Sequence, residues 1–345
     1  MTQGMQGIKA AVIGLGKIAA GYADDPAQTR CYPYATHAQV LRDHPQFDWQ
    51  AVVDVAPEAR KAAQERWQVP ETAACARDLS CAGEIELAVI ATPPENRTEI
   101  LSAFPSLRVV LVEKPLALTL EEAESFLNAC KKRGILVAVN LPRRSDKSLR
   151  SLAKGGLEQR IGRPMAIFGT YGNGLQNNGS HLVDLVRMLL GEVVEVQAVA
   201  HLTPVPEGPI PGDTNPAFSL RLDNEHAVMV HPIRFSHYRE VGLDIWGERG
   251  RLSLLHESLT LIQSPVAPCR ALTGANEILH EAAETSVTTI GHALYEVYEN
   301  LAATLRGEAK LNCSGETGLG TMRVIDAILR SYAAEGRPIQ IAGRA

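Results

Sequence analysis

Residues 8–19 read IKAAVIGLGKIA, an apolar run that ends in a glycine-rich turn. The run, with its Val and Ile residues, has the character of a strand buried on both faces. In the turn, Gly14 permits a sharp change of direction, Gly16 lets the backbone approach a pyrophosphate, and Ala19 stands where a third glycine usually lets helix and strand pack closely. This segment therefore predicts a dinucleotide site formed by Gly14, Gly16, Lys17 and Ile18.

The rest of the first half alternates short apolar runs with helix-like stretches. Strands are predicted at residues 50–54, 85–91, 108–112 and 135–139, and helices at 57–67 and 119–133. Thr119 and Glu122 have the spacing of a capping box at the start of the second helix. Runs that are apolar on both faces suit a parallel sheet covered by helices on each side. We therefore expect a doubly wound Rossmann domain over residues 1–142.

The second half changes character and favours antiparallel strands. Helices are predicted at about residues 145–153, 180–190, 290–305 and 316–334, and strands at 164–171, 194–202, 218–222, 227–232, 241–246 and 252–255. Short turns at 223–224 and 247–250 join neighbouring strands, which is typical of antiparallel connections. The only proline-rich stretch, residues 204–216, is interpreted as a loop. We expect an α+β domain over residues 143–345 with a large, mostly antiparallel open sheet.

The composition excludes several classes of function. The chain has 345 residues, with 34 Lys and Arg against 39 Asp and Glu, and a formal net charge of −5. This balance gives no electrostatic reason to expect nucleic acid or an anionic membrane as a partner. No apolar stretch approaches the roughly 20 residues of a membrane-spanning helix. The six cysteines form no CxxC pair, so no metal site is predicted. Because no basic leader precedes the first strand, we expect a cytoplasmic protein.

Asp54, at the end of the second predicted strand, has the chemistry to select the cofactor. Its carboxylate can accept hydrogen bonds from both ribose hydroxyls and would repel a 2′-phosphate, which favours NAD over NADP. It lies 40 residues after Gly14, where about 20 is usual. We therefore predict an insertion within about residues 21–47. The alternative interpretation is an aspartate that caps the following helix.

Three motifs give the chain a family resemblance. They are Thr92-Pro93-Pro94, Glu113-Lys114-Pro115 and the segment from Asn177 to Asp184, which contains G-x-H-x-x-D. With the glycine turn they resemble the Gfo/Idh/MocA (glucose-fructose oxidoreductase / inositol dehydrogenase) family over most of the chain. The resemblance implies a nicotinamide-dependent oxidoreductase that acts on a CH–OH group of a sugar, cyclitol or nucleotide sugar. It also implies cofactor contacts from Thr92, Pro93, Glu113 and Lys114.

The same motifs supply a candidate catalytic set. Oxidation of a secondary alcohol needs a base within about 2.6 to 3.2 Å of the hydroxyl, and an imidazole suits this role near neutral pH. His181 is the candidate base, and Asp184, three residues on, lies on the same helical face. Lys114 can stabilise developing alkoxide charge. We expect Lys114 and His181 to meet over one alcohol carbon; the alternatives are a surface lysine and a core histidine.

Substrate contacts are predicted from polar residues around these motifs. Asn140 and Arg144 match an N-x-x-x-R element of the family, and a guanidinium suits a carboxylate or diphosphate. The candidate substrate-binding residues are Asn140, Arg144, Tyr171, Asn177, Asn178 and His181. Two positions depart from the family pattern: Asn177 replaces an aspartate, so a carboxylate contact becomes an amide contact, and Arg97 replaces a histidine near the cofactor loop.

Two other functional hypotheses fit the same motifs. The first is a non-catalytic, dinucleotide-sensing regulatory protein of the same fold. The second is an enzyme that holds NAD permanently and uses it for redox-neutral chemistry or transfer between two sugars. Independently of these, the alternating strands between residues 194 and 255 have an apolar outer face. That face predicts a homodimer or homotetramer formed through the second sheet.

Overall fold

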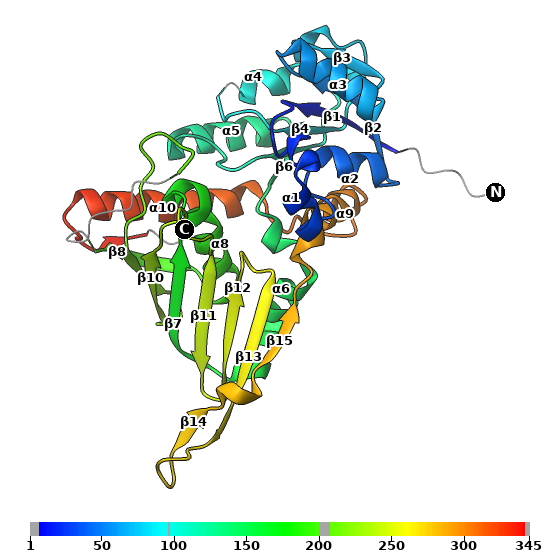
Figure 1. Cartoon of the computed structure of the whole chain (residues 1–345). Helices are drawn as coiled ribbons and strands as arrows, with labels where there is room; N and C mark the ends of the chain where they lie inside the picture. Colours follow the sequence, from blue (N-terminus) through cyan, green and yellow to red (C-terminus); the bar gives the residue numbers. More distant parts are fainter. Residues whose placement is uncertain (1–6, 96, 200–207, 342–345) are drawn as a thin grey trace. The chain divides into compact units, whose positions relative to one another are not determined.

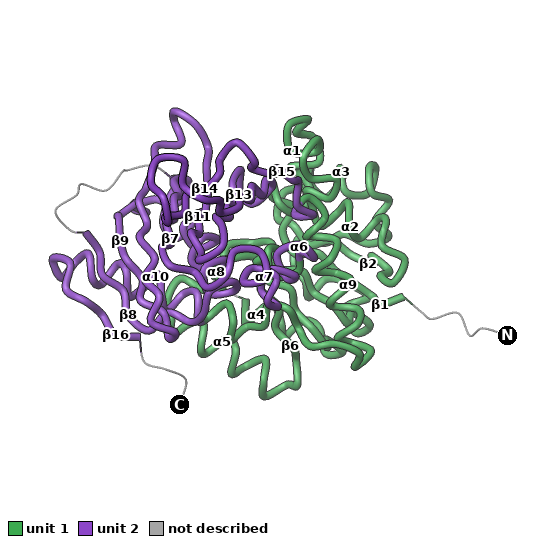
Figure 2. The backbone as a smooth tube through the Cα atoms, turned by 90° about the horizontal axis from the view of Figure 1, so that it is seen from below, with its two compact units in different colours: residues 1–145, 291–319 green, residues 146–290, 320–345 purple. Residues whose placement is uncertain are grey.

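The fold is described from a computed structural model, which covers residues 7–95, 97–199 and 208–341. Two compact units are present (Figure 2). Unit 1 contains the residues up to Ser145 together with Gly291–Leu319, and unit 2 contains Asp146–Ile290 with the residues from Gly320 onward. No helix of the described part is long and apolar enough to cross a membrane.

Unit 1 is built on a six-stranded parallel sheet. Its strands are β1 (Ile8–Ile13), β2 (Phe47–Val53), β3 (Glu71–Ala73), β4 (Leu87–Ile90), β5 (Val109–Val112) and β6 (Leu136–Val139). They lie in the order β3-β2-β1-β4-β5-β6, and β1 pairs with both β2 and β4. The strand order reverses between β1 and β4, which is where open α/β sheets bind their ligands. The predicted doubly wound Rossmann sheet is confirmed.

Helices cover this sheet (Figure 1). The predicted helices are present as α3 (Pro57–Trp67) and α5 (Leu120–Lys132), and α4 (Arg97–Ser102), which was not predicted, and α9 (Ala293–Leu305) join them. The capping box of α5 is present, because the Thr119 hydroxyl accepts from the Glu122 backbone while the Glu122 carboxylate accepts from the Thr119 backbone. Each of these two bonds gives a hydrogen-bond partner to a backbone N–H group at the helix start that has none within the helix.

Helix α9 belongs to unit 1, whereas the sequence predicted one continuous second domain from residue 143. Leu294, Val297, Tyr298 and Leu301 of this helix are buried in the same core as β1, β4 and β5. Their spacing of three and four residues forms one apolar helix face. The chain therefore returns to the first unit late in the sequence, which periodicity alone does not reveal.

The helix after the glycine turn is interrupted by extra residues. A first turn forms after Gly16 and continues into a short 3₁₀ helix, Gly21–Asp24, and then α1 (Pro26–Cys31). Helix α2 (His37–Asp43) takes up the interrupted bonding pattern, because the backbone N–H groups of His37 and Ala38 donate to the carbonyls of Ile18 and Ala19 at 3.1 and 2.9 Å. The predicted insertion is confirmed.

Unit 2 is built on a ten-stranded sheet. Its strands are β7 (Pro164–Tyr171), β8 (Val193–Ala198), β9 (Phe218–Leu222), β10 (Ala227–Pro232), β11 (Gly242–Gly247), β12 (Gly250–Leu255), β13 (Thr260–Pro268), β14 (Asn276–Ile278), β15 (Glu284–Val287) and β16 (Ile339–Gln340). Among the strands that the structure describes here, only β7 and β10 pair in parallel, so the predicted mostly antiparallel sheet is confirmed. The end of the strand predicted at 194–202 lies outside the described residues.

Helices lie against one face of this second sheet. They are α8 (Ser180–Leu189) and the part of α10 (Gly315–Ala333) that belongs to unit 2, with α6 (Lys147–Ser151) and α7 (Leu157–Ile161) beside them (Figure 1). On the other face Phe168 and Met229 are half exposed and lie opposite each other in register. An apolar pair of this kind suits an interface. The homodimer or homotetramer stays a prediction, which light scattering in solution tests.

Candidate functional site

Five predicted site residues follow the carboxyl ends of the parallel strands of unit 1. These residues are Gly14 after β1, Asp54 after β2, Thr92 shortly after β4, Glu113 after β5 and Asn140 after β6. The carboxyl ends of parallel strands meet at one edge of a sheet, so this topology gathers side chains that are distant in sequence. Lys114 comes directly after Glu113 and is half-buried.

The glycine turn has the geometry of a phosphate site. Gly14 has a φ of +89°, and a Cβ at this position would lie 2.7 Å from the Thr92 side chain, so no other residue fits. At Gly16 a Cβ would have no described heavy atom within 4 Å, so the main chain is open to approach. Lys17 is exposed and Ile18 is half-buried in the turn that follows. This cradle fits the pyrophosphate of a dinucleotide.

Asp54 is held in place by backbone amides on two sides. One carboxylate oxygen accepts from Leu15 N at 2.6 Å and the other from Ala56 N at 2.8 Å. The first bond ties Asp54 to the glycine turn. The second reaches the N-cap residue of α3 and not the helix itself, and in the described part of the chain α3 has no side-chain cap, so the alternative of a capping aspartate is wrong. A carboxylate has about four acceptor sites, so two remain for ribose hydroxyls. Arg60 donates to the carbonyls of Asp54 and Val55 and brings a cation to the same loop.

Glu113 is the centre of a hydrogen-bonded cluster in unit 1. Its Oε1 lies 2.9 Å from His37 Nε2 and accepts from Asn140 Nδ2 at 2.5 Å. His37 is fully buried, and its Nδ1 lies 2.8 Å from the Tyr298 hydroxyl. Burial alone would raise the pKa of Glu113, but the hydrogen bonds from His37 and Asn140 and the charge of Lys114 hold that pKa below its usual value. Glu113 is therefore an anion at neutral pH.

Arg97 joins the loops that follow β4 and β5. Its guanidinium is 3% exposed and donates to the carbonyls of Glu113, Pro115 and Leu116 at 2.6 to 2.9 Å. A longer contact of 3.5 Å reaches the Thr92 carbonyl. Burial lowers the pKa of Arg97 to about 10, so the side chain is still charged at neutral pH. The arginine that departs from the family pattern thus fixes the backbone around Lys114, whose peptide bond to Pro115 is cis.

Two buried acceptors flank this cluster. Asn140 Oδ1 and Thr92 Oγ1 have no hydrogen-bond partner within the described part of the chain. Because Asn140 Nδ2 donates to Glu113, its Oδ1 is aimed elsewhere. Buried polar groups without a partner carry a cost that a bound ligand removes. With the open backbone at Gly16, these atoms fit the polar groups of a nicotinamide dinucleotide.

His181 and Asp184 lie on the first turns of α8 in unit 2. His181 is half-buried, and Asp184 is almost fully buried. Asp184 Oδ1 accepts from the Thr321 hydroxyl at 2.9 Å, and Arg187 Nη1 donates to the same hydroxyl at 2.7 Å. At least one oxygen of Asp184 therefore supports the packing of α8 on α10. The predicted catalytic roles of both residues stay predictions.

The polar residues before α8 are also held by local contacts. Asn177 Nδ2 donates to the Asn173 carbonyl at 3.0 Å, while Asn178 Nδ2 is buried and has no partner in the described ranges. Tyr171 is fully buried and its hydroxyl donates to the Pro216 carbonyl at 2.7 Å. That hydroxyl donates its proton within unit 2, so it has no second donor to offer a substrate. Arg144, in the 3₁₀ turn Pro142–Arg144 of unit 1, is half-buried.

Sequence reasoning missed three residues of this arrangement. His37 and Tyr298 were not considered, and Asp213 fell in a stretch interpreted as a loop. The Asp213 carboxylate accepts from the backbone amides of Gln176, Asn177 and Thr214, and burial raises its pKa despite these bonds. It therefore fixes the segment that leads into His181. His37 is the residue at which the helix resumes after the insertion, and this position was the sequence signal that could have pointed to it.

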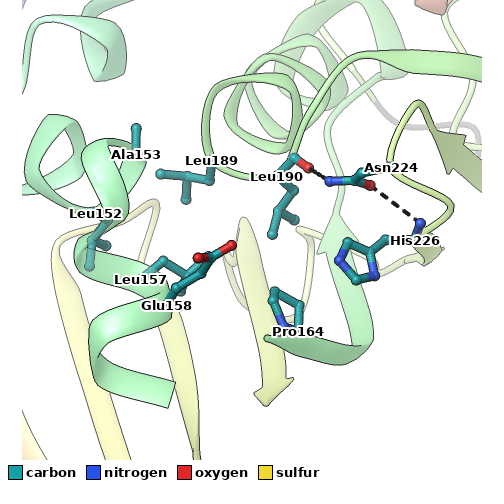
Figure 3. Close-up of a pocket in the computed structure, with 10 residues that line it drawn as sticks. Leu152, Ala153, Leu157, Glu158, Pro164, Leu189, Leu190, Asn224 and His226 are labelled. Atoms are coloured by element: carbon teal, nitrogen blue, oxygen red, sulfur yellow. Dashed lines mark hydrogen bonds between the residues drawn. The ribbon is translucent and has the colours of Figure 1, made fainter. Parts of the chain in front are cut away.

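Unit 2 also contains a small cavity of about 80 Å³ (Figure 3). Its lining includes Leu157, Leu189, Leu190 and the Asn224 amide, which donates to the Leu190 carbonyl at 2.6 Å. None of the predicted site residues lines it. It lies beside the carboxyl end of α8, whereas His181 lies at the amino end. A space this small does not hold a nucleotide, and among the described residues no group of three His, Cys, Asp or Glu side chains could hold a metal ion.

Asp54 gives a direct test of cofactor choice. The change Asp54→Asn keeps an acceptor for Leu15 N but removes the charge that repels a 2′-phosphate, and Arg60 remains to attract it. We expect the ratio of NADPH to NADH affinity to rise by about 10- to 100-fold. Fluorescence titration with each nucleotide measures this ratio. The gain should be lost in Asp54→Asn/Arg60→Gln; an unchanged ratio in Asp54→Asn would contradict the assignment.

Comparison with known proteins gives matches along most of the chain. Residues 8–141 match a family model described as an oxidoreductase family with an NAD-binding Rossmann fold, and residues 170–341 match its C-terminal alpha/beta domain. Levoglucosan dehydrogenase of Pseudarthrobacter phenanthrenivorans is 28% identical over 206 residues, which cover 50% of this chain and 52% of the relative. The chain thus spans about half the length of that relative.

Two further similarities extend over nearly the whole chain. Inositol 2-dehydrogenase of Rhizobium meliloti is 22% identical over 326 residues, 89% of this chain and 95% of the relative. The solved structure of the WlbA dehydrogenase of Bordetella pertussis, in complex with NADH and UDP-GlcNAcA, aligns with a TM-score of 0.72 and 20% identity. The alignment covers 98% of this chain and all of the other, and at this identity it shows the shared fold.

Proposed function

The chain belongs to the Gfo/Idh/MocA family of oxidoreductases, and from this premise we propose that it is an NAD-dependent dehydrogenase of a sugar, cyclitol or nucleotide sugar. The observation that carries the proposal is the anionic Glu113 beside Lys114, at the same sheet edge as the glycine turn. The names of the relatives support the substrate class, because levoglucosan and inositol are polyhydroxylated rings with secondary alcohols.

In this proposal the residues of unit 1 hold the dinucleotide and prepare a cation. Gly14, Gly16, Lys17 and Ile18 contact the pyrophosphate, and Asp54 accepts from the ribose hydroxyls. The nicotinamide, when bound, supplies or accepts the hydride. Thr92, Pro93 and Asn140, at the edge where the parallel strands of unit 1 end, contact the nicotinamide. Lys114 donates a hydrogen bond to the reacting oxygen, and the Glu113 anion keeps its ammonium charged.

In unit 2 the proposed base is His181. A neutral imidazole takes the hydroxyl proton as hydride leaves the carbon, and it returns that proton in the reverse direction. Asp184 is proposed to orient His181 through the first turns of α8, in addition to its bond with Thr321. Asn177 and Asn178 are proposed to bind neighbouring hydroxyls, and Arg144 to bind an anionic substituent.

The test is NADH formation at 340 nm with a panel of sugars, inositols and nucleotide sugars. In His181→Gln we expect kcat/KM to fall by roughly 10² to 10⁴-fold. A histidine acts as a base only when neutral, so wild-type kcat/KM should rise with pH as His181 loses its proton, and the variant should lose this rise. His231→Gln, an exposed histidine on β10, is the matched control. A variant with wild-type activity and pH dependence would contradict the assignment of His181.

Other outcomes of the same assay separate the two remaining hypotheses. Tight NADH binding without turnover of any substrate would favour a regulatory protein that senses the dinucleotide. Purification with NAD still bound after gel filtration, and product formation without net reduction of added NAD, would favour redox-neutral chemistry. The dehydrogenase is favoured here because Lys114 and its anionic neighbour are both retained, and a sensor has no need of them.

A further inference from the structure

Glu113 receives its hydrogen bonds from two side chains on different elements. His37 begins α2, and Asn140 follows β6. An ionised carboxylate only accepts, so His37 Nε2 carries the proton of the 2.9 Å bond to Glu113. In the tautomer with its proton on Nε2, Nδ1 is an acceptor, and the Tyr298 hydroxyl, 2.8 Å away, donates to it. In this series of two hydrogen bonds, the Tyr298 hydroxyl donates to His37 and His37 donates to Glu113.

His37 is also bonded to the glycine turn through its main chain. Its backbone N–H donates to the Ile18 carbonyl at 3.1 Å, where the interrupted helix resumes. One residue therefore contacts the proposed pyrophosphate turn with its backbone and the neighbour of Lys114 with its side chain. Tyr298, on α9, packs against Phe47 with ring centroids 5.3 Å apart, which fixes the far end of the chain of bonds.

We propose that His37, supported by Tyr298, is a positioning residue that holds Glu113 ionised and oriented beside Lys114, in register with the glycine turn. The proposal rests on the proposed function in that Lys114 is the group whose placement matters. A network in which each donor has one acceptor is rigid, whereas a buried carboxylate that loses a donor reorients or takes a proton.

The other charged groups around Glu113 do not replace His37. Lys114 precedes the cis bond to Pro115 and is the cation that Glu113 serves. Arg97 donates to the Glu113 backbone carbonyl and leaves the carboxylate to other donors. Burial raises the pKa of Tyr298 well above its usual value, so its phenol stays protonated and can donate to His37.

Three substitutions test this role. In His37→Leu the donor is lost; we expect kcat to fall by about 10²-fold. We also expect the Glu113 limb of kcat/KM, a second break on the acid side of the His181 limb, to move up by about one pH unit because Glu113 holds its proton more tightly. His37→Gln keeps an N–H donor and should restore most of kcat and the position of the limb. Tyr298→Phe removes one oxygen and keeps the ring, so its effect should be smaller and in the same direction.

His44→Leu is the matched control. His44 follows α2 and is 2% exposed, but it stacks on Tyr295 and lies 3.4 Å from Glu299, away from Glu113. We expect it to lower the melting temperature while kcat and the Glu113 limb stay unchanged. The proposal fails if His37→Leu and His44→Leu have equal effects on kcat and on the limb, or if His37→Gln is as impaired as His37→Leu.

A measurement without turnover separates this proposal from the proposed function. At pH 8, His37→Leu should lower the melting temperature much more in the wild-type background than in Glu113→Gln, because only the carboxylate needs the charge-assisted bond. If wild-type protein oxidises no substrate, the proposed function fails, while this comparison still tests the pairing. Equal decreases in both backgrounds would overturn the role of His37.

Discussion

Lys114→Ala is expected to lower kcat/KM for the alcohol by about 10² to 10³-fold, the range typical of a lost group that stabilises transition-state charge. The reason is that the reacting oxygen loses its donor, while the glycine turn and Asp54 still hold the dinucleotide. NADH affinity, measured by fluorescence titration, should therefore change far less than kcat. Lys114→Arg keeps the charge with a different geometry and should recover only part of the loss.

Lys132→Ala, an exposed lysine of α5, provides the control for Lys114→Ala. It removes the same side chain from the same unit and should leave both kcat and NADH affinity unchanged. The double variant Lys114→Ala/His181→Gln gives a further test. If the two residues act on one atom, their effects combine to much less than the product of the single effects. Equal losses in Lys132→Ala and Lys114→Ala would contradict the role of Lys114.

Arg97→Ala is expected to have the largest effect on stability. The guanidinium satisfies the carbonyls of Glu113, Pro115 and Leu116 in a buried setting, and each acceptor without a partner costs about 1 to 3 kcal/mol. Because the residues around the three carbonyls relax in part, we expect the free energy of unfolding to fall by about 3 to 5 kcal/mol. Urea denaturation followed by circular dichroism measures this change.

Arg77→Ala is the surface counterpart of Arg97→Ala. Arg77 is exposed and pairs with Glu99 at 2.9 Å, so its removal should change the free energy of unfolding by less than about 0.5 kcal/mol. Arg97→His restores the residue of the family pattern and one or two donors, so it should lie between wild type and Arg97→Ala. A variant Arg97→Ala as stable as Arg77→Ala would show that the carbonyls find other partners.

The first sheet was predictable because its strands carry their own signal. The runs at residues 8–13, 85–91, 108–112 and 135–139 are apolar apart from one charged residue near the start of each of the first three, and a parallel sheet covered on both faces buries such runs. The strands at residues 260–268 and 284–287 were missed because their exposed or half-buried residues lack a regular apolar alternation. Helix α9 was predicted as an element, but its place in unit 1 depends on contacts far apart in the sequence.

The residues of the candidate site also differ in whether a local sequence pattern points to them. Gly14, Asp54 and Lys114 could be predicted as candidate site residues because each follows a recognisable strand and has a chemistry that its position explains. His37 and Tyr298 are separated by 261 residues and meet through a single hydrogen bond, which no local pattern encodes. Arg97 was noticed only as a departure from the family pattern. Its four carbonyl contacts depend on loops that end two different strands, so its role becomes visible only in the folded chain.

The interruption of the helix after the glycine turn bears on how such chains are recognised. In a regular helix the Ile18 carbonyl would accept from the amide four residues later, but here it accepts from His37. Roughly 15 extra residues therefore lie between the two partners, and the next bond, from Ala38 to Ala19, continues the same pattern. A scan that demands a fixed glycine-to-acid spacing passes over this protein, although Asp54 is hydrogen-bonded to Leu15 N of the glycine turn in the folded chain. Alignment methods that admit a gap inside this helix, and not only between elements, recover the equivalence.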